Sequence, residues 1–278
     1  MRRTLHISAV GTSLLSNAEA TSREEVRRRG FEGWGRYPAD HEKQAQLLSR
    51  AKRGDELFEF ILDFIKSKGR DASAELSTLL DPNYVKKEDE IRLYPTYTGN
   101  SSFAAQALYE YLRSQGYTVH DPSQTRLAKP EAGFEDEFEQ TLFSLIDKVG
   151  GDIADYSEKG WRVYIHASAG FKAETTFMVI IGSLMGADLI LYRHESFQRV
   201  VALPALKLKI DTTLLDELKK FRQHVPKSVA DQWMLTPYDL SELKDLGYIK
   251  ETPSGYILRE WIKKYLEKNE KTKPEMPN

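Results

Sequence analysis

Short apolar runs alternate with helix-like patterns over the first two hundred residues. Each run is short enough to be a strand buried on both faces of a sheet. The expected strands are residues 5–10, 91–94, 116–120, 161–166 and 189–192, with an added edge strand at 197–203. The expected helices begin near Leu14 and cover 57–65, 72–80, 103–112, 134–149 and 172–184. Strands that alternate with helices in this way predict a doubly wound α/β domain over about residues 1–205.

Two segments depart from this alternation. Residues 21–50 are charged and helix-prone but broken by glycine and proline, so we expect a peripheral insertion. After Ile210 the pattern becomes three helices, a hairpin at 248–258 and a last helix to about residue 268. This order predicts a winged-helix domain over 206–268, in which Thr236 caps the third helix, followed by a disordered tail at 269–278.

Polar loops of small residues follow three of the expected strands, at 11–13, 95–100 and 166–172. The carboxyl ends of parallel strands meet at one edge of a sheet, where α/β proteins bind ligands. Two of the loops open helices, whose free N–H groups and positive dipole end favour an anion. Lys172, in the first turn of its helix, adds a positive charge. We therefore expect one site for a phosphate-bearing ligand.

The residues of these loops suit such a ligand, although each also has a simpler explanation. Thr12 and Ser13 can bind a phosphate through their hydroxyls, but both are also ordinary helix caps. Lys172 suits an oxyanion, whereas a lone surface lysine is the commoner case. His166 is either a ligand contact or a packed neighbour. The ligand contacts that we expect are Gly11, Thr12, Thr96, Thr98, Asn100, His166, Ser168, Ala169, Gly170 and Phe171, beside Ser13 and Lys172.

Composition and missing motifs exclude several classes of protein. The 278 residues carry a net charge of -2, so no basic field attracts nucleic acid or an anionic membrane. The absence of cysteine excludes thiolate chemistry, and six scattered histidines lack zinc-site spacing, so we expect no metal. No P-loop, dinucleotide-binding or nucleophile-elbow motif occurs. Without a signal peptide or a span of about 20 apolar residues, we expect a cytoplasmic protein.

The segment HASAGFK at 166–172, together with GTS at 11–13, resembles the turns of CRISPR-associated CARF domains. In particular it is similar to ring nucleases, which cleave cyclic oligoadenylate messengers. The chain departs from that pattern at His166, where asparagine is usual, and at 95–100, which is often acidic in relatives. The resemblance covers the α/β domain, for which it implies a Rossmann-like CARF fold, and an attached winged helix is a known arrangement in the family.

This resemblance implies a homodimer with cyclic tetra-adenylate on its two-fold axis. It implies a reaction without metal or cofactor, in which an adenosine 2′-hydroxyl attacks its own 3′-phosphodiester and leaves a 2′,3′-cyclic phosphate end. Lys172 would then stabilise the phosphorane, and Ser13 would position the phosphate or the hydroxyl. Such an enzyme would switch off type III CRISPR signalling.

Two other functions remain open. A non-catalytic sensor or transcription regulator could act through the winged helix, but Asp239, Glu242 and Asp245 of its third helix would repel DNA. We therefore expect no DNA binding by this segment. The third hypothesis is an α/β protein that binds another nucleotide. Arg36 and His41 match the R-x4-6-H motif of a HEPN ribonuclease, but we interpret this match, within the insertion, as chance.

Overall fold

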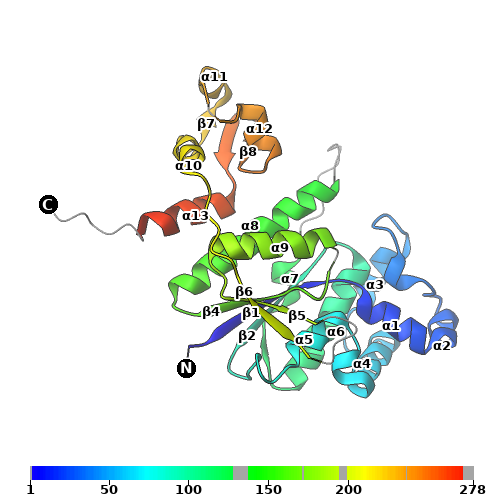
Figure 1. The fold of residues 1–278 in the computed structure, drawn as a ribbon. Helices are drawn as coiled ribbons and strands as arrows, with labels where there is room; N and C mark the ends of the chain where they lie inside the picture. The colour runs from blue at the N-terminus through cyan, green and yellow to red at the C-terminus, as the bar shows by residue number, and fades with distance from the viewer. Residues whose placement is uncertain (1, 128–136, 171, 194–198, 236, 272–278) are drawn as a thin grey trace.

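A six-stranded sheet is the centre of the computed structural model, which describes residues 2–127, 137–170, 172–193, 199–235 and 237–271 (Figure 1). The strand order is β3-β2-β1-β4-β5-β6. β1 to β5 pair in parallel, and β6 is an antiparallel edge strand. The strands are β1 (Thr4–Val10), β2 (Glu90–Pro95), β3 (Thr118–Val119), β4 (Arg162–His166), β5 (Leu189–Tyr192) and β6 (Val201–Pro204). The prediction of an α/β fold with a mostly parallel sheet is confirmed.

Helices cover both faces of this sheet (Figure 1). Leu5, Ile7 and Ala9 of β1 alternate along the strand and join the core formed with α8 (Glu137–Glu158) and α9 (Lys172–Met185). A second core, on the other face, contains residues of α1 (Ser13–Thr21), α4 (Glu56–Lys68), α5 (Ala74–Leu79) and α6 (Gly99–Ser114). Shorter elements complete this part of the chain: α2 (Arg23–Arg28), η1 (Trp34–Arg36), α3 (Lys43–Arg50), η2 (Gly69–Asp71) and α7 (Pro122–Thr125).

The insertion at 21–50 is part of the core, which corrects the expectation that it is peripheral. Trp34 is fully buried, and its indole N–H donates to the Leu15 carbonyl over 2.8 Å. Leu47 is also fully buried in the same core. A Cβ on Gly99 would lie 1.8 Å from the Gln44 carbonyl oxygen, so the insertion sits directly against the start of α6. Charged outward-facing positions hid these buried side chains in the sequence pattern.

α8 does not end at Gly150 and Gly151, as the sequence predicted, but continues to Glu158. A Cβ on Gly150 would lie 3.0 Å from the Trp261 Cβ and 3.3 Å from the Ile181 side chain. This glycine therefore allows close helix packing in the interior of a helix, where glycine normally costs about 1 kcal/mol. Tertiary packing explains a residue that by itself suggests a helix end.

The C-terminal unit combines helices with a three-stranded antiparallel sheet of order β7-β9-β8. Its elements are α10 (Thr212–Lys219), β7 (Val225–Pro226), α11 (Lys227–Ala230), α12 (Leu240–Asp245), β8 (Ile249–Thr252), β9 (Gly255–Leu258) and α13 (Glu260–Lys271). The helices and the hairpin were predicted, whereas β7 was not. Asp239 caps α12 with Glu242 in a capping box, and Thr236 lies outside the described residues. α13 extends to Lys271, past the predicted start of the tail at 269.

The last helix of this unit, α13, packs against α8 (Figure 1). Trp261 and Ile262 of α13 are buried in the same core as the sheet. A Cβ on Gly247 would lie 2.0 Å from the Phe143 ring, so this turn contacts α8 directly. The core is therefore continuous across residue 206, where the sequence placed a domain boundary.

None of the helices in the described part of the chain combines the length and apolar composition that a bilayer crossing needs.

Candidate functional site

The three polar loops meet at one edge of the sheet, as the sequence predicted. Val10 of β1 is in register with Pro95 of β2, and Ser8 is in register with His166 of β4. The Ser101 hydroxyl links two of the loops, because it donates to the Val10 carbonyl over 2.8 Å and accepts from the Thr96 N–H over 3.0 Å. The strand ends thus form a joined rim.

Gly11 and Gly170 bring the first and third loops into contact. A Cβ on Gly11 would lie 3.3 Å from the Gly170 nitrogen. Gly170 has a φ of +95°, and a Cβ there would lie 2.8 Å from the Ala9 Cβ. Glycine is required at Gly170 by both its backbone angle and this approach. The contact joins the two turns that precede Ser13 and Lys172.

A buried carboxylate that the sequence gave no reason to single out lies at this contact. Glu75 is 1% exposed, and its Oε1 accepts the Gly11 N–H over 2.9 Å. Its Oε2 accepts the Ser13 hydroxyl over 3.1 Å, and this hydroxyl in turn accepts the Ala74 N–H over 3.0 Å. The Gly11 and Ser13 donors expected to bind a phosphate thus bind an internal carboxylate. This arrangement revises the expectation for the first loop, since a phosphate would compete with Glu75.

The third loop is held in place by β5 and its own helix. The Ser168 Oγ accepts the Arg193 N–H over 2.8 Å, and the Ala169 carbonyl accepts the Thr175 hydroxyl over 2.8 Å. Lys172 is exposed, and within the described part of the chain its ammonium has no hydrogen-bond or ion-pair partner. Phe171 lies outside the described residues. The lysine is thus available to an anion at the start of α9.

His166, the last residue of β4, is 1% exposed, and its side chain contacts α5 and β1. Its Nδ1 is 2.8 Å from the Thr78 hydroxyl and its Nε2 is 3.0 Å from His6 Nδ1, while His6 Nε2 is 3.3 Å from Asp89. If Asp89 accepts from His6, both imidazoles can be neutral provided that the Thr78 hydroxyl donates its one hydrogen to His166, 2.8 Å away, and not to the Glu75 carbonyl, 3.3 Å away. The geometry agrees with a packed neighbour and not with a ligand contact.

Burial is the main reason why the pKa values of the two hydrogen-bonded histidines are low. Burial, with the nearby His6, holds the pKa of His166 well below its usual value. Burial also lowers the pKa of His6, although Asp89 partly opposes this effect. For Asp89, burial acts to raise the pKa, but hydrogen bonds from His6 and the Lys86 N–H outweigh it and the pKa is lowered. Both histidines are therefore neutral at physiological pH.

Part of the second loop makes hydrogen bonds to other parts of the protein. The Thr96 and Thr98 hydroxyls are 2.7 Å apart, and Thr96 is buried while Thr98 is half-buried. The buried Asn100 donates from its side chain to the Trp34 carbonyl over 3.2 Å, and its N–H donates to Gln44 Oε1 over 2.8 Å. Asn100 therefore attaches the insertion to α6, which leaves Thr98 as the more accessible expected contact on this loop.

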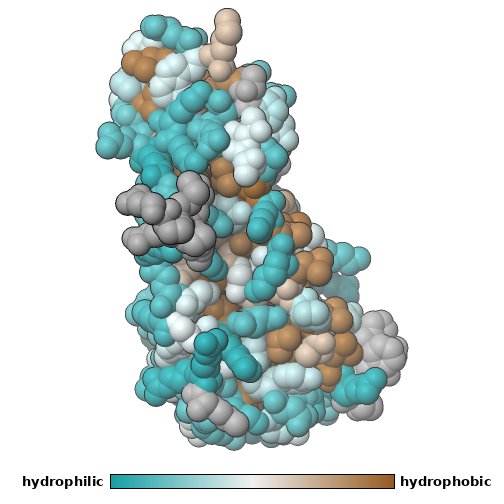
Figure 2. Space-filling model, turned by 60° about the vertical axis from the view of Figure 1, so that its left-hand side comes forward, coloured by the Kyte–Doolittle hydropathy of each residue, from teal (hydrophilic) through white to brown (hydrophobic). Residues whose placement is uncertain are grey.

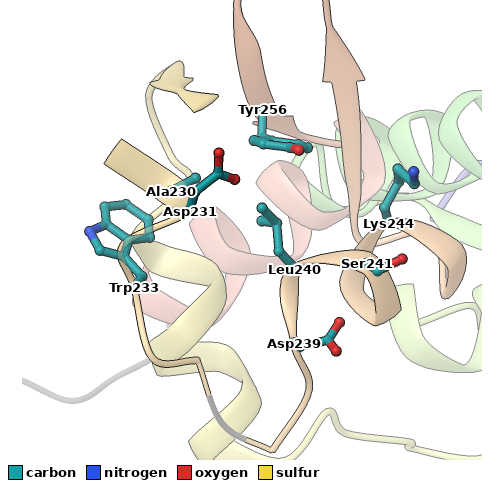
Figure 3. Close-up of a pocket in the computed structure, with 8 residues that line it drawn as sticks. All are labelled: Ala230, Asp231, Trp233, Asp239, Leu240, Ser241, Lys244 and Tyr256. Atoms are coloured by element: carbon teal, nitrogen blue, oxygen red, sulfur yellow. The ribbon is translucent and has the colours of Figure 1, made fainter. Parts of the chain in front are cut away.

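A separate hollow of about 440 Å³ lies in the C-terminal unit (Figure 3). Figure 3 shows Leu240 near its middle, with Trp233 on one side and Lys244 on the other. The residues that line it are Ala230, Asp231, Trp233, Asp239, Leu240, Ser241, Lys244 and Tyr256. Within the described ranges, no three histidine or acidic side chains are placed to hold a metal ion.

Apolar side chains also reach the surface of the sheet-bearing part. The face in Figure 2 shows apolar patches below the C-terminal unit, bordered by hydrophilic residues. Ile180 on the outer side of α9 is 42% exposed, and Leu203 of β6 is 51% exposed. α9 is apolar around most of its circumference, which is typical of a helix covered on all sides.

One protein family has a model that matches this chain, over residues 70–206. The matched segment begins just before α5 and ends after β6, so it includes Glu75, the second loop and Lys172 but not the first loop. The family is described as CRISPR-associated protein (Cas_APE2256). The match supports an association of this chain with CRISPR systems.

Proposed function

We propose that this chain is a CARF-type ring nuclease that binds cyclic tetra-adenylate and cleaves it without a metal ion. The observation that carries the proposal is the contact between Gly11 and Gly170, which places Ser13 and Lys172 at one edge of the sheet. The match to a CRISPR-associated family supports a messenger of that defence system as the ligand.

The proposed chemistry uses a nucleophile that the substrate supplies. The adenosine 2′-oxygen attacks its own 3′-phosphorus and loses its proton, while the bond to the next 5′-oxygen breaks and that oxygen gains a proton. The products are linear, with 2′,3′-cyclic phosphate ends. The protein has to align the 2′-oxygen with the leaving oxygen and to stabilise charge on the phosphorane. The exposed Lys172 ammonium supplies that charge, and Ser13 supplies the alignment.

We propose that the enzyme is a homodimer with the ring on the two-fold axis. A cyclic tetranucleotide can share that symmetry, so that each subunit binds half of it. The exposed Ile180 and the apolar outer side of α9 support this assembly, because α9 begins at Lys172 and a second copy would cover it beside the site.

The order of helices and strands in the C-terminal unit supports a winged helix. This unit raises a second candidate function, a ligand sensor that regulates transcription by binding DNA. α12 carries a capping box of Asp239 and Glu242, and its Lys244 is 3.6 Å from Glu251. An acidic helix whose lysine is paired is a poor DNA reader. We therefore favour the enzyme.

Incubation of the purified protein with radiolabelled cyclic tetra-adenylate in EDTA tests the proposal. We expect linear products with 2′,3′-cyclic phosphate ends, identified by mass spectrometry. Lys172→Ala should reduce the rate roughly 100- to 1000-fold, as for other groups that stabilise transition-state charge. Lys159→Ala is the matched control, because Lys159 is also exposed but precedes the opposite end of β4. A ring that stays intact for hours would exclude the nuclease and favour the sensor.

A further inference from the structure

We propose that Glu75 is a positioning residue that holds the Ser13 hydroxyl as a hydrogen-bond acceptor for the attacking 2′-hydroxyl. The inference rests on the proposed nuclease function. In it, Ser13 binds the attacking 2′-hydroxyl of the substrate and not the phosphate.

The hydrogen bonds of Ser13 decide its role. A serine hydroxyl has one hydrogen to donate and two lone pairs that accept. The hydrogen is directed at Glu75 Oε2 over 3.1 Å, and one lone pair accepts the Ala74 N–H over 3.0 Å. The remaining capacity of the oxygen is to accept one hydrogen bond. A phosphate oxygen has no hydrogen to give, whereas a ribose 2′-hydroxyl does.

Glu75 is fixed firmly enough to impose this orientation. Its carboxylate is buried, and its other oxygen accepts the Gly11 N–H over 2.9 Å. It lies on α5, whose first turn is capped by the Ser73 hydroxyl at 3.2 Å from the Leu76 N–H. A carboxylate only accepts hydrogen bonds. Glu75 therefore cannot donate to the Ser13 oxygen, and the Ser13 hydrogen stays directed at Glu75 and away from the ligand.

Glu75→Gln reverses this polarity without removing bulk. The Gly11 N–H must face the new amide oxygen, because two donors cannot face each other. The amide NH₂ then donates to the Ser13 oxygen, which already accepts from Ala74. The Ser13 hydrogen is then free to donate to a phosphate oxygen of the ligand. The Ser13 oxygen, with both lone pairs in use, no longer accepts from the 2′-hydroxyl.

The test measures single-turnover cleavage and equilibrium binding of cyclic tetra-adenylate for wild type, Glu75→Gln, Ser13→Ala and the double variant. We expect Glu75→Gln to cleave roughly 10- to 100-fold more slowly, as for a misaligned nucleophile, with binding as tight as wild type or tighter. In the Ser13→Ala background the same substitution should change the rate by less than about twofold, since Glu75 acts through Ser13. A purely structural role would lower the rate in both backgrounds.

Glu75→Asp provides a second variant should the glutamine variant fail to fold, because the shorter carboxylate cannot reach Gly11 and Ser13 together. We expect slower cleavage with unchanged binding. Wild-type cleavage by Glu75→Gln, an equal loss in the Ser13→Ala background, or a loss of binding that matches the loss of rate would each overturn the assignment. An intact ring with the wild-type protein would instead overturn the nuclease function, and the role of Glu75 with it.

Discussion

Gly170→Ala tests whether the third loop packs against the end of β1. Alanine in the left-handed region costs about 1–2 kcal/mol, and Gly170 has a φ of +95°. The new Cβ would lie 2.8 Å from the Ala9 Cβ, an overlap with a buried strand residue. Overpacking of this kind costs about 1–3 kcal/mol. We therefore expect the free energy of unfolding to fall by about 2–5 kcal/mol in all.

Gly160→Ala separates the two costs. Gly160 has a φ of +75°, but a Cβ there would meet nothing within 4 Å. It should lose only about 1–2 kcal/mol for the backbone angle. Both variants also share the entropic gain of replacing glycine in the unfolded chain, which therefore cancels in their difference.

Urea unfolding, followed by tryptophan fluorescence, gives these free energies. Ala9→Gly removes the atom that Gly170→Ala would strike, so in that background the cost of Gly170→Ala should fall by about 1–3 kcal/mol. Equal losses for Gly170→Ala and Gly160→Ala, with no rescue by Ala9→Gly, would show that Gly170 does not pack against β1 as described.

Three further predictions concern the surrounding fold. Gly247→Ala should destabilise the protein by about 2–5 kcal/mol, because its Cβ would meet the Phe143 ring at 2.0 Å; calorimetry should show Phe143→Ala offsetting part of that loss. The two buried histidines have lowered pKa values, so the unfolded chain takes up protons below about pH 6.5 that the native state does not. Stability should therefore fall as the pH drops below about 6.5, by at most about 1.4 kcal/mol per pH unit for each histidine, and a folded His166→Gln with an unchanged slope in urea titrations would contradict this. Trp34→Ala should cost about 3–5 kcal/mol in the same unfolding assay, and a cost below 1 kcal/mol would mean that the insertion is peripheral after all.

The sheet could be predicted because its strands are short apolar runs that need no partner to be recognised. Their alternation with helices also placed the three loops on one edge, which the register of Val10 with Pro95 confirms. The interior of α8 could not be predicted, since Gly150 is explained by Trp261, more than a hundred residues later. A glycine in the sequence indicates conformational freedom of the backbone. It does not indicate which side chain, distant in the sequence, packs against it.

The position of the site could be predicted from the sequence, but the roles of its individual residues were predicted less well. Lys172 is exposed at the start of its helix, as its position after a small-residue turn suggested. Asn100 and His166 have the right residue types, but the fold uses both for its own hydrogen bonds. Glu75 was missed because one acidic residue in a short helix looks like surface. Only the fold shows that this carboxylate is buried beneath Gly11.

The packing of α13 on α8 has a consequence for synthesis of the protein. α8 ends at Glu158 and α13 begins at Glu260, so about a hundred residues separate two helices that share one core. At about 5–20 residues per second, a ribosome needs roughly 5 to 20 seconds to make that interval. During this time the apolar surface of α8 that receives Trp261 is uncovered. A chain that stops before α13 therefore exposes this surface, and we expect it to need chaperones or to aggregate.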